Sequence, residues 1–198
     1  MSKPLFILAS CIVLFACAKN FPPVKSAGHT NAGEVVLAKP KVNWRLVTDS
    51  PGIKEYVPKE QTEHNWTEMM TFITFDLVDQ DVNALADQYK NNSAAFCKEQ
   101  ATFKNFNGKE SGYPVAVWFH LCSSNNTTLQ GEITLYKAIQ GHDGLYLVMH
   151  AARVPAFRLN DKNLPMKDET IKEWLNDFSS VVVCDTRISD SCSAGINK

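Results

Sequence analysis

One cysteine and two histidines are the residues whose spacing could support catalysis. His120 and Cys122 are two positions apart on a predicted strand, so their side chains should share one face of a sheet. His150 lies on another predicted strand, which pairing within the sheet could bring close to them. A thiol beside a histidine is a nucleophile with its base, so these residues define a hypothetical catalytic site.

The alternative is that these residues are structural. A cysteine of an exported protein is usually oxidised when a partner is available, and strand histidines usually belong to the core or the surface. The carboxylates are scattered, and the sequence has no Gly-x-Ser-x-Gly, His-Glu-x-x-His or phosphate-binding motif. Asp76, Asp79 and Asp81 lack the glycine and closing glutamate of a calcium loop. We therefore expect a protein without a catalytic residue, metal or cofactor.

The N-terminal residues have the pattern of an export signal. Lys3 supplies an early positive charge, the apolar run 5–15 follows, and Ala16 is a small residue suited to cleavage. The run is about half as long as the roughly 20 residues that span a bilayer. We therefore expect a signal peptide of residues 1–16 rather than a membrane-spanning helix.

The stretch Leu14-Phe15-Ala16-Cys17 resembles the lipobox of bacterial lipoproteins. The resemblance implies that the Cys17 thiol receives a diacylglycerol, and two or more acyl chains hold a protein firmly on a membrane. Ala18 and Lys19 resemble the pattern that follows the cysteine in lipoproteins sorted to the outer membrane. An ordinary signal peptide with Cys17 merely nearby is the alternative.

Four further cysteines lie beyond this region: Cys97, Cys122, Cys184 and Cys192. An even number in an oxidising compartment predicts two disulfide bonds, with three possible connectivities. We favour Cys184–Cys192, because a short polar loop joins them, and this leaves Cys97 to pair with Cys122. Four free thiols or metal ligation are the alternatives, but no Cys-x-x-Cys pair supports a zinc site.

Composition and patterning predict one globular domain behind a tether. The 198 residues are 44% hydrophobic and 21% charged, and the net charge of −1 without a basic run argues against nucleic-acid binding. Prolines and glycines predict a flexible tether at 17–41, followed by a single domain at 42–198. Periodicity predicts helices at 81–97 and 166–183, and strands at 42–47, 53–58, 65–75, 115–122, 131–139 and 145–154.

This order of elements predicts an α+β fold, with a mainly antiparallel sheet packed by two amphipathic helices. The order, together with a closing helix that carries Trp174, resembles the PsbP/Mog1-like fold, which small bacterial lipoproteins of unknown function share. Residues 55–69 are also similar to a pattern in uncharacterised exported bacterial proteins. Neither resemblance implies an activity.

Large aromatic residues mark a candidate binding surface, since they bury much area while exposing a polar edge. We expect Tyr56, Trp66 and Trp118 to contribute to it, with core packing as the alternative. The function that best fits is a non-catalytic binding or envelope-assembly lipoprotein, anchored to the outer membrane through Cys17 and facing the periplasm. Its partner would be an envelope protein. A periplasmic immunity or inhibitor lipoprotein that binds an effector protein is the alternative, and an enzyme with an unrecognised site is a third.

Overall fold

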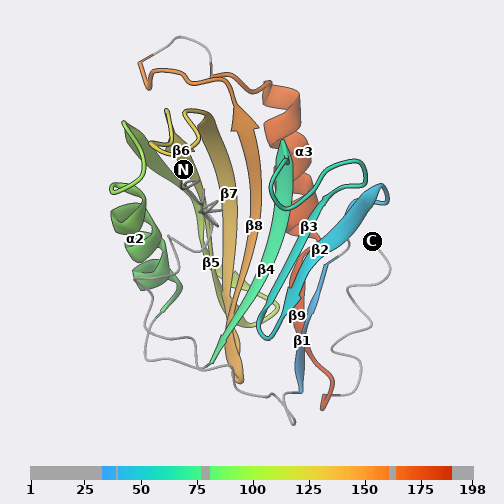
Figure 1. The fold of residues 1–198 in the computed structure, drawn as a ribbon. Helices are drawn as coiled ribbons and strands as arrows, with labels where there is room; N and C mark the ends of the chain where they lie inside the picture. The colour runs from blue at the N-terminus through green and yellow to red at the C-terminus, as the bar shows by residue number, and fades with distance from the viewer. Residues whose placement is uncertain (1–32, 39, 77–80, 161–163, 189–198) are drawn as a thin grey trace, which may run out of the picture.

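The centre of the fold is a long antiparallel sheet (Figure 1). The computed structural model describes residues 33–38, 40–76, 81–160 and 164–188. Its seven-stranded sheet has the order β2-β3-β4-β8-β7-β6-β5. The strands are β2 (Trp44–Ser50), β3 (Ile53–Pro58), β4 (Glu68–Asp76), β5 (Gln100–Glu110), β6 (Tyr113–Cys122), β7 (Gly131–Gln140) and β8 (Gly144–Val154).

Helix α2 (Val82–Ser93) covers one face of this sheet, here called the α2 face. The Asp81 carboxylate caps its start by accepting hydrogen bonds from the backbone N–H groups of Asn83 and Ala84. Val82 and Leu85 pack against the sheet residue Trp118 and its neighbours on β7 and β8. The predicted amphipathic pattern therefore places this helix correctly, although the helix ends at residue 93 rather than 97.

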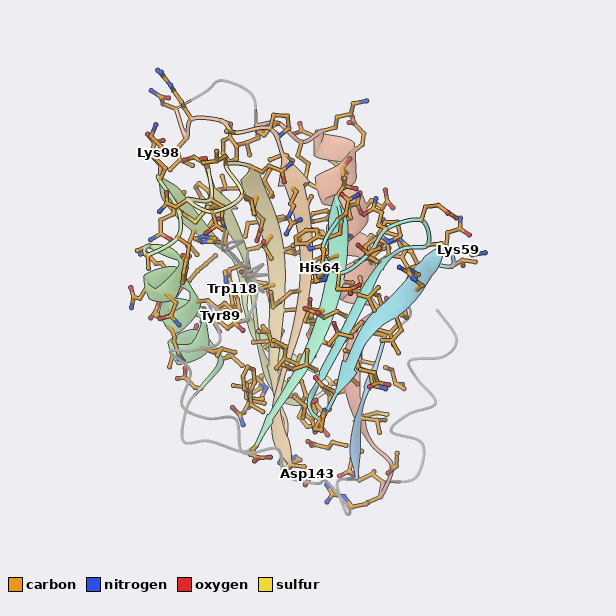
Figure 2. All side chains as sticks on the ribbon, viewed as in Figure 1. Lys59, His64, Tyr89, Lys98, Trp118 and Asp143 are labelled. Carbon is orange, nitrogen blue, oxygen red and sulfur yellow. A yellow bond between two sulfur atoms is a disulfide. The ribbon has the colours of Figure 1, made fainter. Side chains whose placement is uncertain are left out.

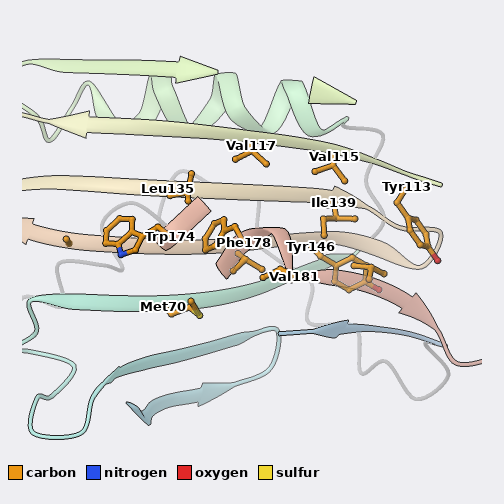
Figure 3. Close-up of a cluster of buried hydrophobic side chains, with 13 residues drawn as sticks. Met70, Tyr113, Val115, Val117, Leu135, Ile139, Tyr146, Trp174, Phe178 and Val181 are labelled. Carbon is orange, nitrogen blue, oxygen red and sulfur yellow. The ribbon is translucent and has the colours of Figure 1, made fainter. Parts of the chain in front are cut away.

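Helix α3 (Asp168–Ser179) covers the opposite face, here called the α3 face. Trp174 and Phe178 are buried against Val115, Leu135 and other apolar residues of the central strands (Figure 3). Because helices cover both faces of the sheet, the central strands β7 and β8 are apolar on both sides. The predicted α+β class is confirmed.

Two short strands form a separate ribbon on the α3 face. β1 (Glu34–Leu37) pairs antiparallel with β9 (Val182–Asp185), which follows α3 along the chain. Val36 and Val183 turn toward the core cluster that α3 also covers. The ribbon therefore lies over the sheet rather than extending it.

The ribbon corrects the predicted domain boundary. We expected residues 17–41 to form a flexible tether, but residues 34–37 of that range are a paired strand. The β-branched pair Val35-Val36 within Glu34–Leu37 favours this strand, and the prolines and glycines around it obscured the signal. The folded part of the chain therefore begins before residue 42, whereas residues 17–32 lie outside the described residues.

Two other strands, β5 and β9, were not predicted because their local sequence gives a weak strand signal. β5 is an edge strand, so most of its side chains are exposed and its sequence does not alternate cleanly. β9 has only four residues and was predicted as part of the second helix and the polar tail. Both strands are defined by long-range pairing rather than by local composition.

A disulfide bond joins Cys97 to Cys122, as predicted, with their Cα atoms 5.3 Å apart. It connects the segment after α2 to the last residue of β6. Cys184, on β9, also takes part in a disulfide bond. Its expected partner Cys192 lies outside the described residues, as does Cys17.

Candidate functional site

The three aromatic residues expected at a binding surface do not form one. Trp66 is 3% exposed and packs with Val57 and Met69 on the α2 face, and the Arg153 guanidinium lies 3.9 Å from its ring centroid. Trp118 is 1% exposed and stacks on Tyr136, close to α2 (Figure 2). The prediction of an exposed surface is therefore wrong for these two residues, because their apolar area packs the core.

The hypothetical Cys–His site does not assemble either. His120 and Cys122 do share the α2 face, but the Cys122 sulfur is bonded to Cys97 and is not a free thiol. His150 lies on the opposite face, where its ring stacks on Trp174 with the centroids 3.8 Å apart. The sheet therefore separates the two histidines.

His150 belongs to a buried aromatic cluster with one acidic partner. Its Nε2 is 3.2 Å from a carboxylate oxygen of Glu68, and the edge of Trp44 packs against its ring. Burial lowers the pKa of His150, and the hydrogen bond from His150 lowers the pKa of Glu68. Near neutral pH an ionised Glu68 therefore accepts a hydrogen bond from a neutral His150.

A groove of about 560 Å³ lies between the β1 segment and the α3 face of the sheet, and we call it the β1 groove. This volume falls within the roughly 300–1,000 Å³ that small-molecule sites occupy. Tyr56 and Phe72 meet edge to face in its wall, with ring centroids 5.7 Å apart. The lining comprises Glu34, Val35, Val36, Ala38, Pro40, Ser50, Gly52, Ile53, Lys54, Tyr56, Phe72, Ile73, Thr74, Tyr146, Leu147 and Val148.

Tyr56 is thus the one residue of the predicted binding set that borders this groove. Its side chain is half-buried and comes from β3, which also contributes Ile53 and Lys54. Val36 and Ala38 form the wall on the other side, and we missed them because their segment was predicted to be a tether. The β-branched pair Val35-Val36 is the sequence signal that could have indicated a strand there.

A reciprocal set of hydrogen bonds fixes β1 at one end of the groove. The Glu34 carboxylate accepts hydrogen bonds from the backbone N–H groups of His142 and Asp143 and from the Tyr146 hydroxyl. The Asp143 carboxylate in turn accepts from the backbone N–H groups of Gly33 and Glu34. Arg187 also pairs with Asp143, at 3.0 Å. Both carboxylates therefore have structural roles.

The polar groups on the open side of the groove make fewer interactions than Glu34 and Asp143. Among the described residues the Lys54 ammonium pairs only with Asp49, at a distant 3.9 Å, and its side chain is 56% exposed. Within the described part of the chain, the Tyr56 hydroxyl makes no hydrogen bond. The groove thus has apolar walls, the hydrogen-bonded carboxylate of Glu34 at one end, and the Lys54 ammonium at its rim, where a ligand could reach it.

Metal binding finds no support in the residues that the structure describes, where no group of three or more His, Cys, Asp or Glu side chains is placed to hold an ion. Within those same ranges no helix has the length and apolar character needed to cross a membrane.

Comparisons with known proteins identify no family for this chain. No family model matches it, and no curated protein matches it either. Among solved structures, a point mutant of the protein Mog1 is similar over 72% of this chain and 78% of its own, with 10% identity and a TM-score of 0.45. LpqN, described as involved in cell envelope biogenesis of Mycobacterium tuberculosis, is similar over 77% of this chain and 82% of its own, with 9% identity and a TM-score of 0.41.

Human STARD10 is a more distant likeness, with 12% identity and a TM-score of 0.31 over 72% of this chain and 69% of its own. At these identities and TM-scores none of the three likenesses carries an argument, and the site has to be interpreted from its own geometry.

Proposed function

We propose that this protein is a lipid-anchored binding module that faces the periplasm from the outer membrane and holds its ligand in the β1 groove. The β1 groove is the observation that carries the proposal, because its apolar walls and few polar groups have the character of a ligand site. The ligand is a small molecule or a segment of an envelope protein that fits a space of about 560 Å³.

Two features support export and anchoring. The Leu14–Cys17 sequence resembles a lipobox, and a diacylglycerol on Cys17 would keep the mature protein on its membrane. The Cys97–Cys122 disulfide fits the same location, since disulfide bonds persist in oxidising compartments such as the periplasm.

A non-catalytic role is supported by the structural interactions that the residues most suited to catalysis already make. Cys122 is oxidised, the His150 ring is enclosed by tryptophans, and the Nδ1 atom of His120 lies 3.0 Å from the Thr102 hydroxyl. Each of them has a structural explanation.

The anchor is tested with Cys17→Ser. We expect this variant to lose labelling by radioactive palmitate and to move from the membrane fraction to the soluble periplasmic fraction. Cys97→Ser, which alters another cysteine, should still be labelled and remain with the membrane. A wild-type protein that carries no acyl label, or a Cys17→Ser variant that stays membrane-bound, would contradict the anchor.

The groove is tested by placing a photo-crosslinking amino acid at Tyr56, which lines it on the α3 face, and at the exposed Lys59, which does not. Irradiation of intact cells should give an adduct at position 56 that is missing at position 59, and mass spectrometry would identify it. A small-molecule or envelope-protein adduct supports the proposal. A toxic effector as the adduct would favour the immunity alternative, and equal adducts at both positions would rule out the groove.

A further inference from the structure

We infer that the β1 groove binds a long-chain fatty acid, with the apolar chain inside the groove and the carboxylate at the rim beside Lys54. The inference rests on the proposed function, since it names the ligand class of the same groove. It follows from the chemistry of the walls, the charge of the lining residues and the volume.

The walls favour an apolar chain. Val36 and Ala38 line the groove on the β1 side, and Phe72 and Val148 line it on the sheet side. A methylene chain placed between them would replace water against apolar surface, which is worth about 0.8 kcal/mol for each buried CH₂ group. The volume of about 560 Å³ lies in the lower half of the range for small-molecule sites and therefore favours one chain rather than two.

The charges favour an anionic head group. Glu34 is the acidic residue of the lining, but its carboxylate is buried and already accepts three hydrogen bonds. Of the described residues that line the groove, Lys54 is the sole cation, and its only ion pair is the distant one with Asp49. A carboxylate at the rim would form an ion pair with the Lys54 ammonium and place a hydrogen-bond acceptor near the Tyr56 hydroxyl.

The arrangement of β3 places these groups together. Lys54 and Tyr56 are two residues apart on β3, and their cross-strand partners are Phe72 and Met70. Side chains at this spacing share one face of the sheet, here the α3 face that the groove borders. The polar head and the start of the chain would therefore contact one strand.

The experiment measures displacement of the fluorescent polyene cis-parinaric acid from the full chain carrying Cys17→Ser, so that the protein has no acyl chains of its own. Palmitate and the neutral hexadecanol have the same chain length and differ in the head group. We expect palmitate to displace the probe at a concentration about three- to tenfold lower than hexadecanol, because the ammonium of Lys54 is partly exposed.

Three variants locate the binding. Lys54→Gln should remove the advantage of palmitate, whereas Lys59→Gln, outside the groove, should preserve it. Ala38→Trp introduces a large side chain into the groove wall on the β1 side and should weaken binding of both ligands. Thermal unfolding of each variant verifies that it is folded.

The outcomes separate the two proposals. Equal displacement by palmitate and hexadecanol, or a Lys54→Gln variant with unchanged preference, overturns the fatty-acid assignment. No binding of the probe, or binding that Ala38→Trp leaves unchanged, also overturns it. The adduct at position 56 tests the groove independently, so an adduct without fatty-acid binding refutes only the ligand class.

Discussion

At the scale of single residues, the buried histidines differ in how their rings are satisfied. His120 is 7% exposed and its Nδ1 lies 3.0 Å from the Thr102 hydroxyl, whereas its Nε2 has no hydrogen-bond partner among the described residues. Burial lowers its pKa from 6.5 to about 4, because no acidic side chain compensates for the loss of solvent around the imidazolium. His150 is also buried, but Glu68 opposes the effect of burial on its pKa.

The low pKa of His120 predicts a loss of stability in mild acid. Between pH 6.5 and about 4 the unfolded chain binds a proton that the folded protein excludes, so the free energy of unfolding should fall as the pH is lowered through this window. The effect of His120 alone is on the order of 3 kcal/mol. His120→Asn, which retains a polar atom near Thr102, should flatten the decline measured by urea denaturation at several pH values.

His64→Asn is the matched control, since the His64 side chain is 70% exposed. It should leave the pH dependence unchanged. His150 adds to the same decline, so the His120→Asn variant should retain a shallower slope. If His120→Asn had the same slope as the wild type, the assignment of the acid sensitivity to His120 would be wrong.

At the scale of elements, the contact of α3 with the sheet depends on one buried lysine. The Lys137 ammonium, on β7, donates to the carbonyl oxygens of Phe178 and Val181 at 2.9 and 2.8 Å, and to Glu110 at 2.5 Å. The Phe178 carbonyl lies in the last turn of α3, where acceptors lack full partners within the helix, and the Val181 carbonyl lies in the short link to β9. The ammonium therefore caps the helix from the sheet, with its charge balanced by Glu110.

Replacing Lys137 should lower the free energy of unfolding. Lys137→Met keeps the length of the side chain but removes the donor to the Val181 carbonyl, one of the donors to the Phe178 carbonyl, and the partner of the partly buried Glu110. We expect a loss of about 3 kcal/mol in the free energy of unfolding. Lys109→Met, on the exposed part of β5, should change it by less than about 0.5 kcal/mol. Chemical denaturation of both variants provides the comparison, and equal stabilities would refute the capping role.

At the scale of the whole molecule, β1 closes the β1 groove and pairs with β9, the last strand of the described residues. The Glu34 carboxylate binds the turn between β7 and β8. The Glu34–Asp143 hydrogen bond links residues 109 positions apart. The groove therefore exists only when both ends of the domain are in place.

This closure predicts the effect of truncation. A chain that starts at residue 33 keeps β1, whereas one that starts at residue 42 loses Val36 and the Glu34 hydrogen bonds. We expect the shorter chain to be less stable by on the order of 4 kcal/mol, and to expose apolar surface that binds a hydrophobic dye. Equal urea midpoints and equal dye binding would show that the domain begins at residue 42.

Local patterns in the sequence determined much of the fold. The helical spacing of Val82 and Leu85, and of Trp174 and Phe178, predicted both helices, since 3.6-residue periodicity is a property of the chain itself. The turn at 141–144 between two apolar runs predicted the β7–β8 hairpin. The even number of cysteines beyond the N-terminal segment predicted disulfide bonds, and Cys97–Cys122 is one of them.

The tertiary structure alone decided which residues meet at the candidate site. Nothing in the local sequence indicates that Val36 would pair with Val183, or that Lys54 and Tyr146 would border one space, because strand pairing and packing join segments far apart in the chain. It also decided that Trp66 and Trp118 are core residues and that His120 and His150 are on opposite faces. Burial depends on what covers a side chain, and for these residues the cover is supplied by distant elements.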